Sequence, residues 1–312
     1  MKITIIEPIG AKQNLLQAFQ ENLKKLGHEL TSYDSRPENN AQIIERANDS
    51  DIIIASNLLI DSNVINACQN LKMISIAFTG YDHIDINTCN QKNIVVCNTP
   101  GYSTDSVAEL TICLIISVLR KLIELEKKTR ELSTREGFLG IELKGKTVGV
   151  IGTGTIGMRV IELLNAFGCN VVCYSRTKKP DLNYVELDEL LKISDIVTLH
   201  LPLNDNTKHL INKDKLDLMK ENAIIINTAR GQIIDNNALA DTILSKKILG
   251  AGLDTVDMEP PLPRNYKLLL TQNTVIMPHI GYATKEAINN RTNIVFGNVL
   301  SFLNGNILNK VN

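Results

Sequence analysis

The chain has 312 residues, of which 44% are hydrophobic and 21% are charged, a composition typical of a folded globular protein rather than a disordered one. Its 33 Lys and Arg residues against 34 Asp and Glu residues leave a formal net charge of −1, which argues against a general nucleic-acid-binding protein. The length predicts about two domains.

The cysteines and the N-terminus indicate the compartment. The six cysteines include no C-x-x-C pair, and most lie in apolar runs, so we expect buried, reduced thiols. The N-terminal segment lacks the long apolar region and cleavage site of a signal peptide. The longest apolar stretch, residues 112–119, is much shorter than a membrane span. We expect a cytoplasmic protein with no metal, membrane or nucleic-acid partner.

Strand-like and helix-like runs alternate in the first third of the chain, a pattern typical of α/β proteins with parallel sheets. Strands are predicted at residues 2–7, 28–34, 51–56, 73–78 and 94–98. A helix is predicted at residues 11–27, where Leu residues and Phe19 recur with a 3.6-residue period. Further helices are predicted at residues 40–48 and, as a short segment, before residue 73.

After Pro100 a second series begins. Residues 103–130 are predicted to form one long helix with an apolar middle and a charged end. Strands follow at residues 146–152, 170–175, 195–202, 223–229, 250–254 and 274–279, and a last helix at residues 285–304. These strands are nearly continuous apolar runs, as expected where a sheet is covered on both faces.

The two series predict an α/β fold with two doubly wound parallel-sheet domains of the Rossmann or flavodoxin-like kind. The first domain would end near residue 98, and the second would cover residues 99–284. Periodicity does not tell which domain the last helix joins.

A complete G-x-G-x-x-G motif occupies residues 152–157. It directly follows a predicted strand and opens a helix that is predicted at residues 155–167. Its glycines are Gly152, Gly154 and Gly157. In this context the motif predicts a dinucleotide site, with the pyrophosphate at the helix N-terminus. The alternative is a glycine-rich turn that binds nothing.

The end of the next strand carries no acidic residue to bind a ribose 2′-hydroxyl. It has Ser175, Arg176 and Thr177, followed by two lysines. Cationic side chains suit a 2′-phosphate better than a bare hydroxyl, which favours NADP. The alternative is a solvated basic loop.

Polar groups follow three later strands, at the sheet edge where α/β proteins bind ligands. They are Arg230, Asp254 with the nearby Glu259, and His279. An arginine there can bind a carboxylate with two hydrogen bonds, and a histidine can exchange a proton near neutral pH. Taken singly, Arg230 could pair with a surface acid, His279 could stabilise a turn, and Glu259 could be a loop or helix-start carboxylate.

These motifs together resemble the NAD(P)-dependent D-isomer-specific 2-hydroxyacid dehydrogenases over essentially the whole chain. The matching segments are residues 76–85, 97–110, 194–203, 226–239, 250–254 and 278–284, besides the glycine motif. The resemblance implies a substrate domain made of residues 1–98 and 285–312, into which a dinucleotide-binding domain, residues 99–284, is inserted. It also implies a homodimer in which the helix at residues 103–130 is a contact; the alternative is that this helix packs only within its own domain.

The resemblance further implies roles for individual residues. Arg230 would bind the substrate carboxylate, His279 would be the general acid and base, and Glu259 would be its acidic partner. Phe78, Thr79 and Gly80 would bind the carboxylate through backbone N–H groups, although Phe78 could also be a core residue. The implied cofactor contacts are Gly152, Gly154, Thr155, Ile156, Gly157, Ser175, Arg176, Thr177, Thr228, Ala229, Asp254 and Gly281.

The implied reaction is reversible hydride transfer between NAD(P)H and a 2-oxo acid to give a D-2-hydroxy acid. The basic loop favours NADP, whereas NAD is the usual cofactor of the family that the chain resembles. Corepressors of the same fold, which sense dinucleotides, are an alternative, as is a structural protein without catalysis. The sequence does not identify the 2-oxo acid.

Overall fold

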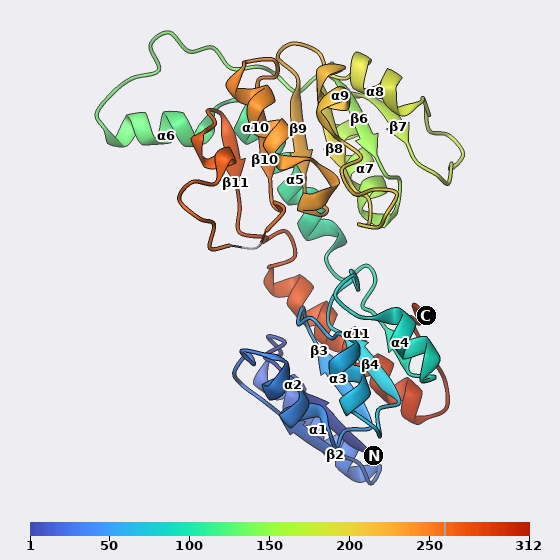
Figure 1. Ribbon diagram of the computed structural model, residues 1–312. Helices are drawn as coiled ribbons and strands as arrows, with labels where there is room; N and C mark the ends of the chain where they lie inside the picture. Colours follow the sequence, from blue (N-terminus) through green and yellow to red (C-terminus); the bar gives the residue numbers. More distant parts are fainter. Residues whose placement is uncertain (259) are drawn as a thin grey trace. The chain divides into compact units, whose positions relative to one another are not determined.

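The computed structural model describes residues 1–258 and 260–312. The chain divides into two compact units, the first formed by residues 1–103 and 283–312 and the second by residues 104–282. Each unit is built on a parallel β-sheet flanked by helices, which confirms the predicted fold class (Figure 1).

The first unit contains a five-stranded sheet in the order β2-β1-β3-β4-β5. Its strands are β1 (Lys2–Ile5), β2 (Glu29–Ser32), β3 (Ile52–Ala55), β4 (Met73–Ile76) and β5 (Val95–Cys97). This is the flavodoxin-like order, in which the direction of winding reverses between β1 and β3. All the strands lie within the predicted runs.

The helices of the first unit are α1 (Gln13–Lys25), α2 (Asn40–Ala47), α3 (Ser62–Ala67), α4 (Ile86–Gln91) and α11 (Lys285–Leu303). Helices α1 and α11 share the core of this unit: Phe19 and Phe296 stack with ring centroids 3.9 Å apart. Figure 1 shows α11, at the red end of the colour scale, beside the blue strands. The last helix therefore belongs with the N-terminal sheet, which periodicity alone did not reveal.

Helix α4 was not predicted. Its sequence, INTCNQ, has no apolar stripe, and only Cys89 in it is buried. The carboxylate of Asp85 caps it by accepting the backbone N–H of Thr88 at 3.0 Å, an arrangement that stabilises a helix N-terminus. Parallel strands β4 and β5 need a crossover connection, and α4 is part of it.

The second unit contains, in its described part, a six-stranded sheet in the order β11-β10-β9-β8-β6-β7. The strands are β6 (Thr147–Ile151), β7 (Asn170–Tyr174), β8 (Ile196–Leu199), β9 (Ile224–Asn227), β10 (Gly250–Leu253) and β11 (Thr274–Ile276). A parallel bridge from Cys173 to Tyr184 adds one residue pair beyond β7. With that bridge counted as a vestigial third strand, the order is that of a Rossmann sheet, whose winding reverses between β6 and β8.

Helices cover both faces of this sheet, so alternate residues of each strand enter different cores. In β9, Ile224 and Ile226 pack with α5 (Thr104–Leu119) and α7 (Thr155–Ala166). Ile225 packs on the opposite face, where α8 (Leu187–Ile193), α9 (Lys213–Asp217) and α10 (Asn236–Leu244) lie. Burial of each isoleucine contributes about 2 kcal/mol to folding, which explains the continuous apolar runs.

The long helix predicted at residues 103–130 is wrong as a single element. Helix α5 ends at Leu119, and α6 covers Leu122–Arg130. Between them Lys121 has φ 47°, and the carbonyl of Leu119 accepts the N–H of Ile141 at 3.1 Å. The apolar residues that pack on the sheet end at Leu119, and none of the α6 residues is buried, so nothing in the core keeps the two helices in line.

Candidate functional site

The glycine motif forms a tight turn between β6 and α7. Gly152 has φ 100°, and a Cβ atom there would lie 2.5 Å from the carbonyl oxygen of His200, at the end of β8. A Cβ on Gly157 would overlap the carbonyl oxygen of Gly152. Both positions therefore require glycine because helix and strand approach closely.

Gly154 differs from the other two glycines. It precedes α7 at the N-cap position, is exposed, and has no described atom within 4 Å of the site that a Cβ would occupy. The helix N-terminus formed by Thr155 and Ile156 thus faces open space. A helix N-terminus with room beside its backbone can bind a phosphate group.

His200 lies beside this turn but is not a candidate for proton exchange near neutral pH. Its Nε2 atom is 3.0 Å from the hydroxyl of Thr198. Desolvation by burial lowers the pKa of His200 from its ordinary value of 6.5 to about 3. The imidazole is therefore neutral at physiological pH.

The basic loop after β7 is anchored at both ends. At its start, the carbonyl of Tyr174 accepts the N–H of Gly152 at 2.8 Å. At its end, the hydroxyl of Tyr184 accepts the N–H of Lys179 at 3.0 Å and lies 2.8 Å from the hydroxyl of Thr153. Tyr184 thus connects the basic loop to the glycine turn. Ser175 is half-buried, whereas Arg176 and Thr177 are exposed.

Arg230 follows β9 in a turn that Asn227 stabilises. The side chain of Asn227 accepts the N–H of Ala229 at 3.0 Å and donates to the carbonyl of Arg230 at 2.9 Å. The half-buried guanidinium of Arg230 donates to the carbonyl of Ala229 at 2.9 Å. Thr228 is anchored by its hydroxyl, which lies 3.0 Å from that of Thr111 on α5. The turn therefore fixes the direction in which the arginine leaves the sheet.

His279 follows β11 and is held by Asp254, which follows β10. The N–H of His279 donates to the carbonyl of Asp254 at 2.9 Å. The N–H groups of Ile280 and Gly281 donate to the two carboxylate oxygens of Asp254, each at 2.8 Å. His279 has φ 57°, a conformation that costs energy for a residue other than glycine and that these bonds stabilise. Its ring lies 5.7 Å from that of Tyr282, edge to face.

The structure brings Arg230, Asp254 and His279 to one edge of the sheet. Strands β9, β10 and β11 are adjacent and parallel, and these residues follow their carboxyl ends. The N–H of Asp254 also donates to the carbonyl of Asn227 at 2.9 Å. The glycine turn follows β6 at the same edge. Glu259, the predicted acidic partner of His279, lies outside the described residues.

Phe78, Thr79 and Gly80 follow β4 in the first unit, at the carboxyl edge of its sheet. The Phe78 side chain is buried, with its ring 6.2 Å from that of Tyr102 and 5.1 Å from the guanidinium of Arg291. Thr79 is exposed and Gly80 half-buried. The side chain of Phe78 is therefore a core residue, as the sequence left open, while the backbone that follows it reaches the surface.

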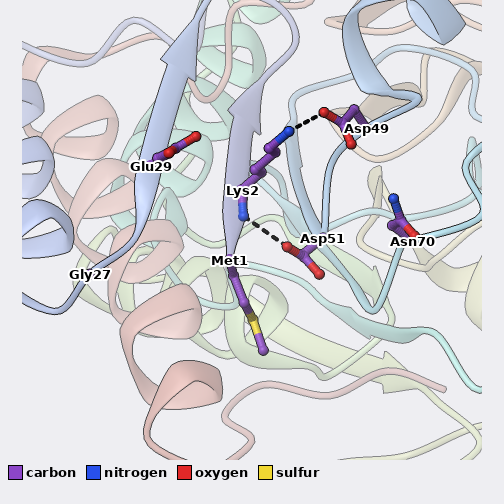
Figure 2. Close-up of a pocket in the computed structure, with 7 residues that line it drawn as sticks. All are labelled: Met1, Lys2, Gly27, Glu29, Asp49, Asp51 and Asn70. Carbon is purple, nitrogen blue, oxygen red and sulfur yellow. Dashed lines mark hydrogen bonds and ion pairs between the residues drawn. The ribbon is translucent and has the colours of Figure 1, made fainter.

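A pocket at the other edge of the first sheet is not part of this arrangement. It is lined by Met1, Lys2, Gly27, Glu29, Asp49, Asp51 and Asn70 (Figure 2). In Figure 2 the ammonium group of Lys2 points to Asp49 and its backbone N–H to Asp51. These residues lie at the amino ends of β1, β2, β3 and β4, opposite to the edge where such sheets bind ligands.

Two residues with a place in these arrangements were not found from the sequence. Tyr184 belongs to no motif, because the strand it represents is reduced to one bridge. Asn98 donates its side-chain amide to the carbonyl of Thr79. It lies in a segment that resembles the family, but only the fold reveals its partner.

Comparisons with known proteins identify a family for this chain. The model of the "D-isomer specific 2-hydroxyacid dehydrogenase, NAD binding domain" matches residues 112–281. A glyoxylate reductase from Thermococcus litoralis is 38% identical over 262 residues, which are 80% of this chain and 78% of that protein. A hydroxypyruvate reductase from Thermotoga maritima is 41% identical over 241 residues, 76% of this chain and 79% of that protein.

Solved structures are similar over nearly the whole chain. An acyclic imino acid reductase in complex with NADPH and D-Arg has a TM-score of 0.92 at 30% identity, with 100% of both chains covered. A D-lactate dehydrogenase from Aquifex aeolicus, complexed with NAD and lactic acid, has a TM-score of 0.86 at 31% identity. That match covers 98% of this chain and 96% of the other.

Proposed function

The chain belongs to the D-isomer-specific 2-hydroxyacid dehydrogenases, and we propose that it transfers a hydride reversibly between NAD(P)H and a 2-oxo acid. The observation that carries this proposal is the grouping of Arg230, Asp254 and His279 at the carboxyl ends of three adjacent strands. The glycine turn at the same edge fits a dinucleotide, because Gly154 leaves open space at a helix N-terminus. Among the described residues, no group of His, Cys, Asp and Glu side chains could hold a metal ion.

The proposed dinucleotide site extends along the edge of the second sheet. When bound, the cofactor supplies the hydride from C4 of its nicotinamide ring. The backbone of Gly152, Gly154 and Gly157, with Thr155 and Ile156, would hold the pyrophosphate. The remaining contacts in this proposal are Ser175, Arg176, Thr177, Thr228, Ala229, Asp254 and Gly281.

Arg230 would bind the carboxylate of the substrate and polarise its carbonyl group. A guanidinium forms two parallel hydrogen bonds to a carboxylate, which orients the group as well as attracting it. Asn227 fixes the backbone of this turn, and the guanidinium of Arg230 donates to the carbonyl of Ala229, so less ordering is needed on binding. In the first unit, the N–H groups of the loop at Phe78, Thr79 and Gly80 would also bind a carboxylate.

His279 would donate a proton to the carbonyl oxygen during reduction and accept it back during oxidation. The hydrogen bonds from residues 279–281 to Asp254 hold its backbone in a fixed turn. Glu259 would be the carboxylate beside the imidazole, and a negative charge there favours the protonated ring that reduction needs. Hydride and proton together convert the 2-oxo group to a hydroxyl, and the product would have the D configuration.

We propose NADP as the preferred cofactor, with NAD also used. Ser175, and not a carboxylate that would repel a 2′-phosphate, follows β7. Arg176 is exposed and near the glycine turn. The link from Tyr184 to Lys179 and Thr153 keeps the basic loop next to the glycine turn. The similar structures include a complex with NADPH and three complexes with NAD.

We also propose that the chain forms a homodimer through α6 and the segment after it. None of the described α6 residues is buried, and four large apolar side chains are exposed here. They are Leu122, Ile123, Leu132 and Leu139, the last two being 95% and 86% exposed. Large apolar side chains left exposed along one segment are typical of a surface that another protein covers. Sedimentation velocity tests the proposed dimer: the unaltered chain should sediment as a dimer, and Leu132→Ser and Leu139→Ser should weaken the association. A monomeric unaltered chain would contradict the proposal.

The relatives indicate where the search for a substrate begins. Glyoxylate and hydroxypyruvate are the substrates that the names of the two relatives imply. The test is a panel of 2-oxo acids with NADH and with NADPH, followed by absorbance at 340 nm. Turnover would exclude a purely dinucleotide-sensing corepressor, and its absence with every acid would contradict the proposed function.

In the described part of the chain, no helix is long and apolar enough to cross a membrane.

A further inference from the structure

The loop at Phe78, Thr79 and Gly80 is tied to the end of β5 by its carbonyl groups. The carbonyl of Phe78 accepts the N–H of Thr99 at 3.0 Å. The carbonyl of Thr79 accepts the side-chain amide of Asn98 at 2.7 Å. The hydroxyl of Thr79 donates to the carbonyl of Thr99 at 2.9 Å, which closes the contact from the other side.

These bonds set the direction of the next two N–H groups. In a planar trans peptide, the C=O and the N–H point in opposite directions. Because the carbonyls of Phe78 and Thr79 both point to the end of β5, the N–H groups of Thr79 and Gly80 both point away from it. Two successive N–H groups directed to one side form a site suited to the two oxygens of a carboxylate.

Asn98 is itself held by two other asparagines. Its backbone N–H donates to the carbonyl of Asn309 at 3.1 Å, and its carbonyl accepts the side-chain amide of Asn298, on α11, at 2.8 Å. Asn309 in turn donates its side-chain amide to that of Asn298 at 2.8 Å. Asn98 is 8% exposed and Asn298 is 1% exposed. Buried amides connected in this way hold a fixed geometry, because each broken bond leaves a polar group without a partner.

We propose that Asn98 is a positioning residue for substrate binding: its side-chain amide orients the Thr79–Gly80 peptide so that the loop can bind the carboxylate of a 2-oxo acid. The inference rests on the proposed function, since it assumes that this loop binds that carboxylate. The residue that orients the loop is thereby a buried one, since Asn98 is 8% exposed.

The role requires a donor at residue 98. Alanine removes the amide and frees the Thr79 carbonyl to turn. Aspartate has nearly the same shape but offers an oxygen to that carbonyl and repels it. Both changes let the Thr79–Gly80 peptide rotate, and one of the two N–H groups is then lost to the substrate. The loss should appear in the KM for the 2-oxo acid, since the loop contributes nothing to the glycine turn that binds the dinucleotide.

Asn312 offers a matched control, because its side chain forms hydrogen bonds to the backbone in and next to the same strand, β5. Its side chain accepts the N–H of Val96 at 2.8 Å and donates to the carbonyl of Ile94 at 2.8 Å. It therefore ties the same C-terminal segment to β5 through an asparagine amide without contacting the loop. Asn312→Ala should lower stability in the same way as Asn98→Ala but leave substrate binding intact.

The experiment measures steady-state kinetics of Asn98→Ala, Asn98→Asp and Asn312→Ala with glyoxylate or hydroxypyruvate, together with the thermal midpoint and the inhibition constant of oxamate. We expect the KM for the 2-oxo acid and the oxamate constant to rise about tenfold or more in both Asn98 variants, the size of one lost hydrogen bond to a charged group. The KM for the coenzyme should stay within twofold, and Asn312→Ala should match the unaltered chain in all three constants.

An unchanged KM for the 2-oxo acid in a folded Asn98 variant would overturn the inference, as would an equal rise in Asn312→Ala or in the coenzyme KM. If Asn98→Ala does not fold, Asn98→Asp, which keeps the size of the side chain, decides the matter. Failure of the unaltered chain to reduce any 2-oxo acid would overturn the proposed function and this inference with it.

Discussion

Asp254 accepts the backbone N–H of His279 through its carbonyl and those of the next two residues through its carboxylate. Three successive N–H groups thus converge on one aspartate, which is 2% exposed. A Cβ on Gly281 would lie 2.8 Å from the Asp254 carboxylate, so the turn also requires a glycine there. The position of the proposed acid and base therefore depends on a residue of the neighbouring strand.

Asp254→Asn should lower kcat about tenfold or more. The amide would offer a donor to one of two N–H groups, and a lost hydrogen bond to a charged group costs about 1.5–3 kcal/mol. Asp195→Asn is the matched control, because Asp195 accepts the N–H of Thr147 at 2.9 Å at the opposite edge of the same sheet. Both variants should unfold at lower temperature, but only the first should lose turnover. Equal kcat values in the two variants would remove Asp254 from this role.

Arg230→Lys should raise the KM for the 2-oxo acid and lower kcat. Lysine keeps the charge but cannot form two parallel bonds to a carboxylate, and a poorly oriented substrate reacts more slowly. Arg159→Lys serves as the control, since Arg159 pairs with the exposed Asp105 and Glu162. Steady-state kinetics that do not differ between Arg230→Lys and this control would assign the carboxylate to other groups.

The acid stability of the second unit should depend on His200. Because the folded-state pKa is about 3 and the ordinary value is 6.5, the unfolded chain takes up a proton that the folded chain refuses over this range. The free energy of unfolding should therefore fall as the pH drops below about 6.5, by up to about 1.4 kcal/mol per pH unit from this group.

The variant His200→Asn can still bond to Thr198 but does not titrate. Thermal unfolding at pH values from 7.5 to 5 should show a shallower loss of stability in this variant than in the unaltered chain. If stability falls with pH equally in the variant and in the unaltered chain, the folded protein protonates His200 as readily as the unfolded chain does. The same measurement bears on the mechanism, since a neutral His200 cannot produce a pH dependence of the rate near neutrality.

The cofactor preference should depend on Arg176. If its guanidinium binds the 2′-phosphate, NADPH is used at least as well as NADH, and Arg176→Ala lowers kcat/KM for NADPH by about ten- to 150-fold. Ser175→Asp should reverse the preference, because a carboxylate repels the phosphate and accepts from the ribose hydroxyl. Lys192→Ala, an exposed cation on α8, is the control. A more than tenfold preference of the unaltered chain for NADH would contradict the phosphate site.

Much of this architecture is visible in the sequence because it follows from local rules. Apolar runs locate the strands, and Gly152 and Gly157 locate the turn, since no other residue fits where helix and strand touch. Arg230, Asp254 and His279 each follow a strand, and parallel strands bring their carboxyl ends together.

Other features depend on contacts between distant residues and could not be read from local patterns. Helix α4 depends on a cap at Asp85 rather than on an apolar stripe. The break at Lys121 reflects where the sheet stops supporting the helix. The series of hydrogen bonds from Asn309 through Asn298 to Asn98 joins segments about 200 residues apart in sequence. Tyr184 contacts Thr153 across 31 residues, which no motif describes.

If the chain transfers a hydride to a 2-oxo acid with His279 as the proton donor, a deuterium label on the coenzyme must appear in the product. The test reduces hydroxypyruvate, whose product has a stereocentre at C2, with NAD(P)H labelled with deuterium at both C4 positions, and analyses the 2-hydroxy acid by mass spectrometry and chiral chromatography. We expect one deuterium at C2 of a D-2-hydroxy acid. We also expect a rate about 10²- to 10⁴-fold lower in His279→Gln, at an unchanged KM for the coenzyme. A product without deuterium, or His279→Gln working at the rate of the unaltered chain, would contradict this mechanism.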